Sequence, residues 1–245
     1  MHFLFKQYVR NHEITVYDTN ELYGEKGNFR VLQFSDAAVQ GAMDLHNPGR
    51  VMFEYPRAII HLMEFNNPDF EDAFLIGHGI GTIAGHFAKK RFKVAELNET
   101  VVELSRAFFG YDAENVVIGD GRLILEGERE QAYDYIILDA FTDKGTPRHL
   151  TSKSFFGMVR QKLESGGAFI MNLMGRGDND SLINAIHTTL SEEFAYIKTF
   201  LLPSGETGDM KNMIMIGRSK PIGFQARQMA GFVEFAPRPG HIITD

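Results

Sequence analysis

The pattern of apolar and polar positions changes character near residue 72 of the chain. Before that point, short β-rich segments follow one another closely and are separated by polar turns. The predicted strands of this part are residues 2–9, 13–18, 29–34 and 38–42. Closely spaced strands of this kind predict a small antiparallel β-hairpin unit over residues 1–50. A helix is expected next, over residues 54–65, with Pro56 in its first turn.

After residue 72, short apolar strands alternate with amphipathic helices. Strands are predicted at residues 73–76, 92–96, 116–118, 133–138, 168–173, 196–202 and 213–217. Helices are predicted at residues 82–90, 98–109, 122–128, 152–163 and 180–190. This alternation predicts an α/β fold, in which a mostly parallel seven-stranded sheet over residues 51–218 is covered by helices on both faces.

Two smaller features complete the pattern. Ser165-Gly166-Gly167 follows the helix predicted at residues 152–163 and predicts a glycine C-cap there. Residues 219–245 show no periodicity and contain three prolines. We therefore expect an irregular C-terminal tail.

The composition narrows the class of protein. The 245 residues include no cysteine, which excludes disulfides, cysteine-ligated zinc and a cysteine nucleophile. A net charge of −7 argues against a nucleic-acid partner, because such proteins need a basic face. No apolar run approaches the ~18–20 residues of a membrane span, and the N-terminus is a poor signal peptide. We expect a cytoplasmic protein without membrane or nucleic-acid partners.

A glycine loop is the first candidate site. Gly77, Gly79 and Gly81 lie between the first predicted strand of the parallel sheet and the helix that follows it. Glycine lets the chain turn sharply and lets the backbone approach a ligand. Ligands of open α/β sheets bind at the carboxyl ends of the strands. The three glycines are therefore candidate cofactor-binding residues, and a tight turn without a ligand is the alternative.

Acidic residues follow the next three predicted strands. Glu96 lies about 20 residues after the glycine loop, where nucleotide-binding α/β folds place the acid that holds the ribose hydroxyls. Asp120, followed by Gly121, can accept a hydrogen bond from an exocyclic amine, or it can cap a helix. Asp139 can take a proton from an amine or hold a cation, or it can cap loop amides. All these strand ends are expected to face one crevice.

Several stretches together resemble the spermidine synthases, the polyamine aminopropyltransferases. The most similar stretches are LIGHGIGT (75–82), VAELNETVVELSRAFF (94–109), VVIGDGRLIL (116–125) and YDYIILDAF (133–141). Others are VLQFSDAAVQGAMD (31–44), FEYPRAI (53–59) and SKSFFGMVRQKLESGGAFIMN (152–172). The resemblance covers about residues 13–217. It implies the Rossmann-like fold of the class I S-adenosylmethionine-dependent methyltransferases and a homodimer.

The resemblance also implies a role for each candidate residue. Glu96 would hold the ribose of S-adenosylmethionine, of its decarboxylated form, or of the product methylthioadenosine, while Asp120 would bind the adenine amine. Gln40 would reach into the pocket from the N-terminal unit. Asp139 would orient and deprotonate the acceptor amine, with Tyr55 on the acceptor side. No metal is implied. The reaction implied is transfer of an aminopropyl group to a small amine or polyamine.

Two departures from the family pattern leave other functions open. The glycine loop of the family carries an acid where this chain has Ile80, and that acid holds the aminopropyl ammonium and repels a carboxylate. The loop after the fourth strand carries a second acid where this chain has Thr142, with Asp143 one step later. A methyltransferase that uses intact S-adenosylmethionine is therefore the first alternative. A catalytically silent protein that binds the nucleoside is the second.

Overall fold

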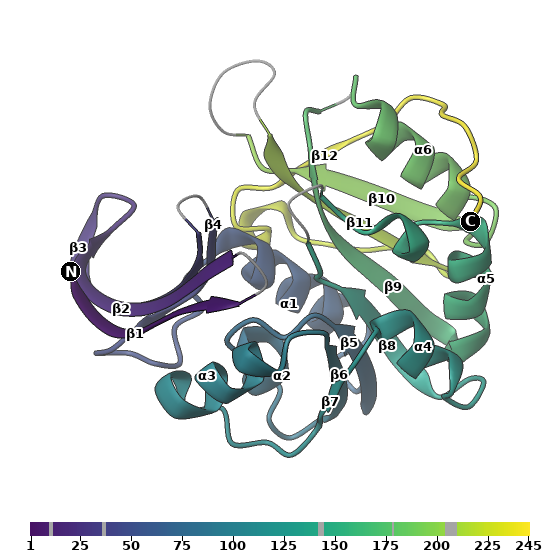
Figure 1. Ribbon diagram of the computed structural model, residues 1–245. Helices are drawn as coiled ribbons and strands as arrows, with labels where there is room; N and C mark the ends of the chain where they lie inside the picture. Colours follow the sequence, from purple (N-terminus) through teal and green to yellow (C-terminus); the bar gives the residue numbers. More distant parts are fainter. Residues whose placement is uncertain (10–11, 36–37, 142–144, 178, 204–209) are drawn as a thin grey trace.

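The computed structural model describes residues 1–9, 12–35, 38–141, 145–177, 179–203 and 210–245. The chain folds into two sheets, a four-stranded antiparallel one and an eight-stranded mixed one, with helices around the larger sheet (Figure 1). This arrangement confirms the predicted fold class, an α/β protein with a mostly parallel sheet and a small antiparallel β unit.

The small sheet is a meander in which each strand pairs with the next. Its strands are β1 (His2–Val9), β2 (His12–Leu22), β3 (Glu25–Phe34) and β4 (Ala38–Asp44). Strands β2 and β3 are longer than predicted, because the turn between them takes only two residues. Tyr23 and Gly24 both have positive φ, 49° and 82°, as a type I′ hairpin turn requires. The neighbouring polar residues that were expected to form a loop are therefore paired as strand.

The large sheet has the strand order β12-β10-β11-β9-β8-β5-β6-β7. Its strands are β5 (Asp72–Ile76), β6 (Arg91–Glu96), β7 (Val116–Ile118), β8 (Tyr133–Leu138), β9 (Leu163–Gly175), β10 (Tyr196–Leu201), β11 (Lys211–Arg218) and β12 (Val233–Phe235). Strands β5 to β9 pair in parallel, and β11 lies antiparallel between β9 and β10.

The predicted count of seven strands is wrong by one. Strand β12 lies inside the tail that was expected to be irregular, and its three residues pair with Thr199–Leu201. A three-residue strand is too short to show a periodicity in the sequence. The rest of the tail contains only a short 3₁₀ helix, Ala226–Gln228.

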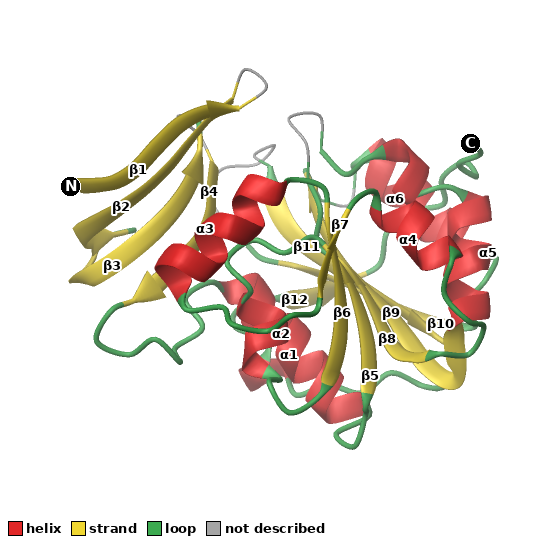
Figure 2. Cartoon of the chain, turned by 60° about the horizontal axis from the view of Figure 1, so that its bottom comes forward, coloured by secondary structure: helices red, strands yellow, loops and turns green. Residues whose placement is uncertain are grey.

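Helices cover both faces of the large sheet (Figure 2). On one side lie α1 (Glu54–Asn66), α2 (Thr82–His86) and α3 (Glu99–Phe109); on the other lie α4 (Gly121–Glu126), α5 (Lys153–Lys162) and α6 (Ser181–Leu190). Alternate residues of β8 show why the last four residues of this strand, 135–138, form an apolar run. Tyr135 and Ile137 join the core under α1, while Ile136 and Leu138 join the core under α5. A strand buried on both faces reads as a continuous apolar run.

Two predictions about helix ends are wrong. Helix α2 stops at His86 rather than near residue 90, because Phe87 leaves helical geometry and packs between the rings of Phe70 and Phe92. The glycines after α5 do not cap it. Leu163 is already extended and begins β9, and a Cβ on Gly167 would lie 2.9 Å from the carbonyl oxygen of Asp134. Gly167 therefore allows an irregular, close pairing of β9 with β8.

The small sheet and α3 lie side by side (Figure 2) and share one apolar core. Its buried members are Ile14, Val16, Leu32, Val101, Leu104 and Phe109. At its rim, Arg30 of β3 donates a hydrogen bond of 3.1 Å to the carbonyl oxygen of Phe108 and forms an ion pair of 2.8 Å with Asp18. This packing holds the small sheet against the glycine loop, which precedes α2.

Candidate active site

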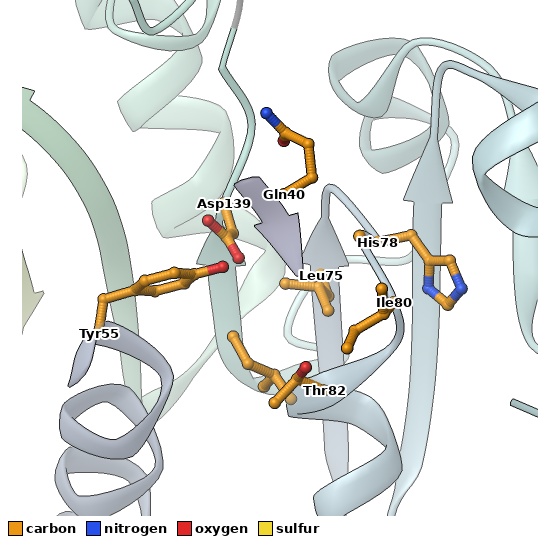
Figure 3. A pocket seen from close by; sticks show the side chains of 9 residues that line it. Gln40, Tyr55, Leu75, His78, Ile80, Thr82 and Asp139 are labelled. Carbon is orange, nitrogen blue, oxygen red and sulfur yellow. The ribbon is translucent and has the colours of Figure 1, made fainter. Parts of the chain in front are cut away.

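A pocket opens at the carboxyl ends of β5 and β8 (Figure 3). The order in which the parallel strands are added to the sheet reverses between β5 and β8. Ligands of open α/β folds usually bind at such a position. The pocket is lined by Gln40, Tyr55, Leu75, His78, Gly79, Ile80, Thr82, Ile83 and Asp139. The empty space that it encloses, part of which is open to solvent, is about 270 Å³. Glu96 and Asp120 do not line it, so a nucleoside held by these acids would extend beyond the pocket along the strand ends.

The glycine loop forms the floor of this pocket. Gly77, Gly79 and Gly81 all have positive φ, at 98°, 56° and 86°. A Cβ on Gly77 would lie 1.9 Å from the carbonyl oxygen of Asp139, and one on Gly81 would lie 2.2 Å from the ring of Tyr111. Glycine is therefore required at both positions by conformation and by space.

We expect Gly77→Ala to lower the free energy of unfolding by more than the ~1–3 kcal/mol of backbone strain alone. The reason is the added clash with the Asp139 carbonyl. Gly177→Ala is the matched control, because Gly177 has a φ of 102° and nothing within 4 Å of the added Cβ. Urea unfolding of the two variants measures the difference. Equal losses would contradict a role for close approach at Gly77.

Glu96 lies where the sequence places it, at the end of β6 beside the glycine loop. Its carboxylate oxygens accept hydrogen bonds from the backbone N–H groups of His78, at 2.9 Å, and Asn98, at 2.8 Å. Burial raises the pKa of Glu96, and these backbone hydrogen bonds oppose that rise. The backbone N–H of Leu97 donates to the same carboxylate. A carboxylate has about four lone-pair sites, so it keeps acceptor capacity for a hydroxyl group.

Asp120 caps the N-terminus of α4 through one carboxylate oxygen, which is the second of the two roles that its sequence position allows. Its Oδ1 accepts from the backbone N–H groups of Arg122 and Leu123, at 2.8 and 3.3 Å. Its Oδ2 lies 3.1 Å from Nε2 of His149. Gly121 lets this turn approach β5, because a Cβ there would lie 2.5 Å from the side chain of Ile76. Neither residue lines the pocket itself.

Asp139 meets two hydrogen-bond donors that come from distant parts of the chain. Tyr55, at the start of α1, donates its hydroxyl (Figure 3), and Asn172 of β9 donates from Nδ2 at 2.9 Å. Burial raises the pKa of Asp139 to about 6, although both hydrogen bonds lower it. Burial, followed by the charge of Asp139, raises the pKa of Tyr55 well above its usual value. Near neutral pH the pair is a carboxylate and a neutral phenol.

Asn172 is a site residue that the sequence interpretation missed. It is 1% exposed and lies in the apolar run Ala168–Leu173. The available signal was that an amide inside a buried strand requires a hydrogen-bond partner. The identity of that partner, 33 positions away in the chain, could not be read from the strand itself.

His78 belongs to the glycine loop, but its ring points away from Asp139 (Figure 3). The ring contacts α3 instead. Nε2 lies 2.7 Å from the hydroxyl of Ser105, which itself donates to the carbonyl of Val102. Nε2 therefore carries the proton and donates it. Burial lowers the pKa of His78 to about 4, and its edge contact with Tyr111 fixes the ring. His78 is therefore a neutral side chain that packs against α3 and Tyr111.

Strand β4 of the small sheet forms the outer wall of the pocket. Gln40 of this strand is one of the residues that line the pocket (Figure 3). Ile80 packs on the neighbouring Gly41, where a Cβ would lie 2.6 Å from Cγ2 of Ile80. The positions of Thr142 and Asp143 lie outside the described residues. Among the described lining residues, Asp139 is the one charged side chain.

Two further observations concern only the described residues. No group of three or more His, Asp or Glu side chains is arranged to hold a metal ion. No helix combines the length and the apolar character that crossing a membrane requires.

The amino-acid sequence is similar to those of known proteins. The chain is 30% identical to putrescine N-methyltransferase 2 of Nicotiana tabacum over 126 residues, which are 47% of this chain and 36% of that protein. It is 26% identical to the polyamine aminopropyltransferase of Vibrio vulnificus over 176 residues, 68% of this chain and 57% of that one. It thus spans between about a third and just over half of these relatives' length.

The fold is similar to that of a probable spermidine synthase from Corynebacterium glutamicum ATCC 13032. The TM-score is 0.75 at 21% sequence identity, over 91% of this chain and 81% of that one. The sequence also matches the spermine/spermidine synthase domain over residues 52–221. Members of that family are transferases. Since this match covers well over half of the length of the chain, the chain belongs to the spermine/spermidine synthase family.

Proposed function

We propose that this protein transfers a carbon group from an adenosyl sulfonium donor to a small amine. The observation that carries the proposal is the carboxylate of Asp139, held by Tyr55 and Asn172 at the inner end of a pocket next to the glycine loop. A single anion in a pocket whose other described lining residues are uncharged favours one ammonium group. The names of the relatives, a putrescine methyltransferase and a polyamine aminopropyltransferase, support an amine acceptor.

The residues of the nucleoside half fit an adenosyl group. Glu96 is the proposed partner of the ribose hydroxyls, and Asp120 is the proposed partner of the adenine amine. Leu97 and Leu123 follow these acids and are 64% and 67% exposed, so they offer apolar surface to a purine ring. The glycine loop lets the backbone approach the ligand closely.

The acceptor half fits proton removal from an ammonium. An alkyl amine has a pKa near ~10 and arrives protonated. The ionised Asp139 attracts this ammonium and takes its proton, while the Tyr55 hydroxyl and the Asn172 amide hold the carboxylate in place. The donor supplies an electrophilic carbon beside its sulfonium, whose C–S bond breaks as the C–N bond forms. Positioned acid–base groups of this kind contribute typically ~10²–10⁴-fold to the rate.

The first candidate for the group transferred is aminopropyl, with release of methylthioadenosine. The match to the spermine/spermidine synthase domain supports this candidate. The cytoplasmic location and the homodimer stay predictions that belong to the same proposal.

Methyl transfer from intact S-adenosylmethionine is the second candidate, and Ile80 is the observation that favours it. Its side chain lines the pocket and packs on Gly41. An apolar group there neither repels the carboxylate of the intact donor nor holds the ammonium of an aminopropyl group. The similarity to putrescine N-methyltransferase 2 supports the same candidate.

Product analysis separates these candidates. The protein is incubated with each donor and a panel of monoamines, diamines and polyamines, and products are identified by mass spectrometry. Methylthioadenosine with an aminopropylated amine supports the first candidate, and S-adenosylhomocysteine with a methylated amine supports the second. Ile80→Asp should move any activity toward the decarboxylated donor. Tight nucleoside binding without any product would overturn catalysis and leave a binding protein.

The dependence of activity on pH should report the ionisation of Asp139. We expect kcat/KM for the amine to fall below about pH 6, because the pKa of Asp139 is raised to about 6 and its protonated form cannot take a proton. Above that pH the profile should be level until the amine itself loses its proton. The acidic limb of kcat should lie lower, because a bound ammonium favours the carboxylate. A limb near 4 in kcat/KM would exclude Asp139 as the titrating group.

A further inference from the structure

A row of amide side chains leads from Asp139 across the sheet. Asn172 of β9 donates from Nδ2 to Oδ1 of Asp139, at 2.9 Å. Asn212 of β11 in turn donates from Nδ2 to Oδ1 of Asn172, at 3.4 Å. The two asparagines lie on paired strands, next to the carboxyl end of β8. Apolar residues surround Asn172 in its strand, so its amide has few other partners.

The direction of these hydrogen bonds follows from the charge at one end. An ionised carboxylate only accepts hydrogen bonds, so Asn172 must present its NH₂ group to Asp139. The amide oxygen then faces Asn212, which must donate. The row is therefore oriented as long as Asp139 carries its charge.

We infer that Asn172 is a positioning residue, which fixes the carboxylate of Asp139 so that a remaining lone pair faces the acceptor amine. The effect of Asn172 on catalysis rests on the proposed function, whereas its effect on the orientation of the carboxylate rests on the geometry alone. Tyr55 holds the carboxylate from the side of α1, and Asn172 holds it from the side of β9. Two donors from different elements hold the carboxylate in one orientation, whereas a single donor would permit rotation about the Cβ–Cγ bond.

The energetics agree with this role. Burial raises the pKa of Asp139, and the hydrogen bond from Asn172 is the larger of the two hydrogen-bond effects that oppose the rise. Hydrogen bonds to charged groups are among the strong ones in proteins. Loss of the Asn172 amide should therefore free the carboxylate to rotate and also favour its protonated form.

The test is Asn172→Leu, which replaces the amide with an apolar group of similar shape. Carbon-13 NMR of the aspartate carboxyl groups is followed against pH, with the Asp139 signal identified by its absence in Asp139→Asn. We expect an inflection near 6 in the unmodified protein and a higher one in Asn172→Leu. With an amine and the active donor, kcat/KM should fall roughly tenfold to a hundredfold, and its acidic limb should move upward with the NMR inflection.

The matched control is Asn184→Leu. Asn184 is 8% exposed and lies on α6, where it accepts a hydrogen bond from the backbone N–H of Arg238, away from the pocket. This variant should leave the Asp139 inflection and both kinetic limbs unchanged. An unshifted inflection in Asn172→Leu would overturn the inference, whether or not activity falls. Because the NMR measurement needs no turnover, an inactive protein would count against the proposed function and not against the role of Asn172.

Discussion

Asp139→Asn is expected to lower kcat by about 10²–10⁴-fold, the contribution typical of a positioned acid–base group. The amide keeps the shape of the side chain but cannot accept the proton of an ammonium. Affinity for methylthioadenosine should be nearly unchanged, because in the proposed arrangement Asp139 contacts the acceptor amine and Glu96 contacts the nucleoside. Steady-state kinetics and calorimetry measure the two quantities. A variant that keeps its turnover would remove Asp139 from the reaction.

The same substitution should stabilise the protein above pH 6. The pKa of Asp139 is raised from 3.8 to about 6 by folding, so the native state binds the proton more tightly than the unfolded chain. Stability therefore falls as the pH rises from about 4 to 6 and stays reduced above it. Asp139→Asn removes this cost, and we expect a gain on the order of 1–2 kcal/mol at pH 8 that disappears near pH 4. Urea unfolding at the two pH values provides the measurement and excludes misfolding as the cause of lost activity.

Glu96→Ala is expected to weaken methylthioadenosine binding at least tenfold. A hydrogen bond to a charged group contributes roughly 1.5–3 kcal/mol, and the proposed contact uses both ribose hydroxyls. Titration calorimetry measures the change. Unmodified affinity in this variant would remove Glu96 from the nucleoside site.

Two controls accompany this measurement. Glu99→Ala removes an exposed carboxylate three residues away, in the first turn of α3, and should leave the affinity unchanged. Glu96→Gln retains one oxygen as an acceptor for the backbone N–H of His78 or Asn98 and should bind with intermediate affinity. If alanine and glutamine at position 96 weakened binding equally, the charge of Glu96 would be the determining property.

The parts of the fold that could be predicted are those with a local physical signal. Strand β8 has apolar residues on both faces, and this alone marks it as an interior strand of a parallel sheet. The glycine loop could be predicted because no other residue adopts a φ of 98° beside a carbonyl oxygen. The acids at the strand ends followed from the parallel arrangement, since all such ends meet at one edge.

Other features depend on pairing between distant segments. The sequence Ser165-Gly166-Gly167 is equally suited to a helix C-cap and to an irregular strand, and only the contact of Gly167 with the carbonyl of Asp134 selects the second. The link between Asp139 and Asn172 is of the same kind. No local pattern indicates that Tyr55, more than 80 positions earlier in the chain, donates to the same carboxylate.

The core that the small sheet shares with α3 has a consequence for the nascent chain. Ile14 and Val16 of β2 leave the ribosome long before Leu104 of α3, with which they share a buried core. At ~5–20 residues per second, translation takes on the order of 10 s to supply the missing helix. During that interval the four strands expose an apolar face that nothing later in the chain yet covers. A chaperone that shields this face should therefore raise the soluble yield more than any change at the pocket.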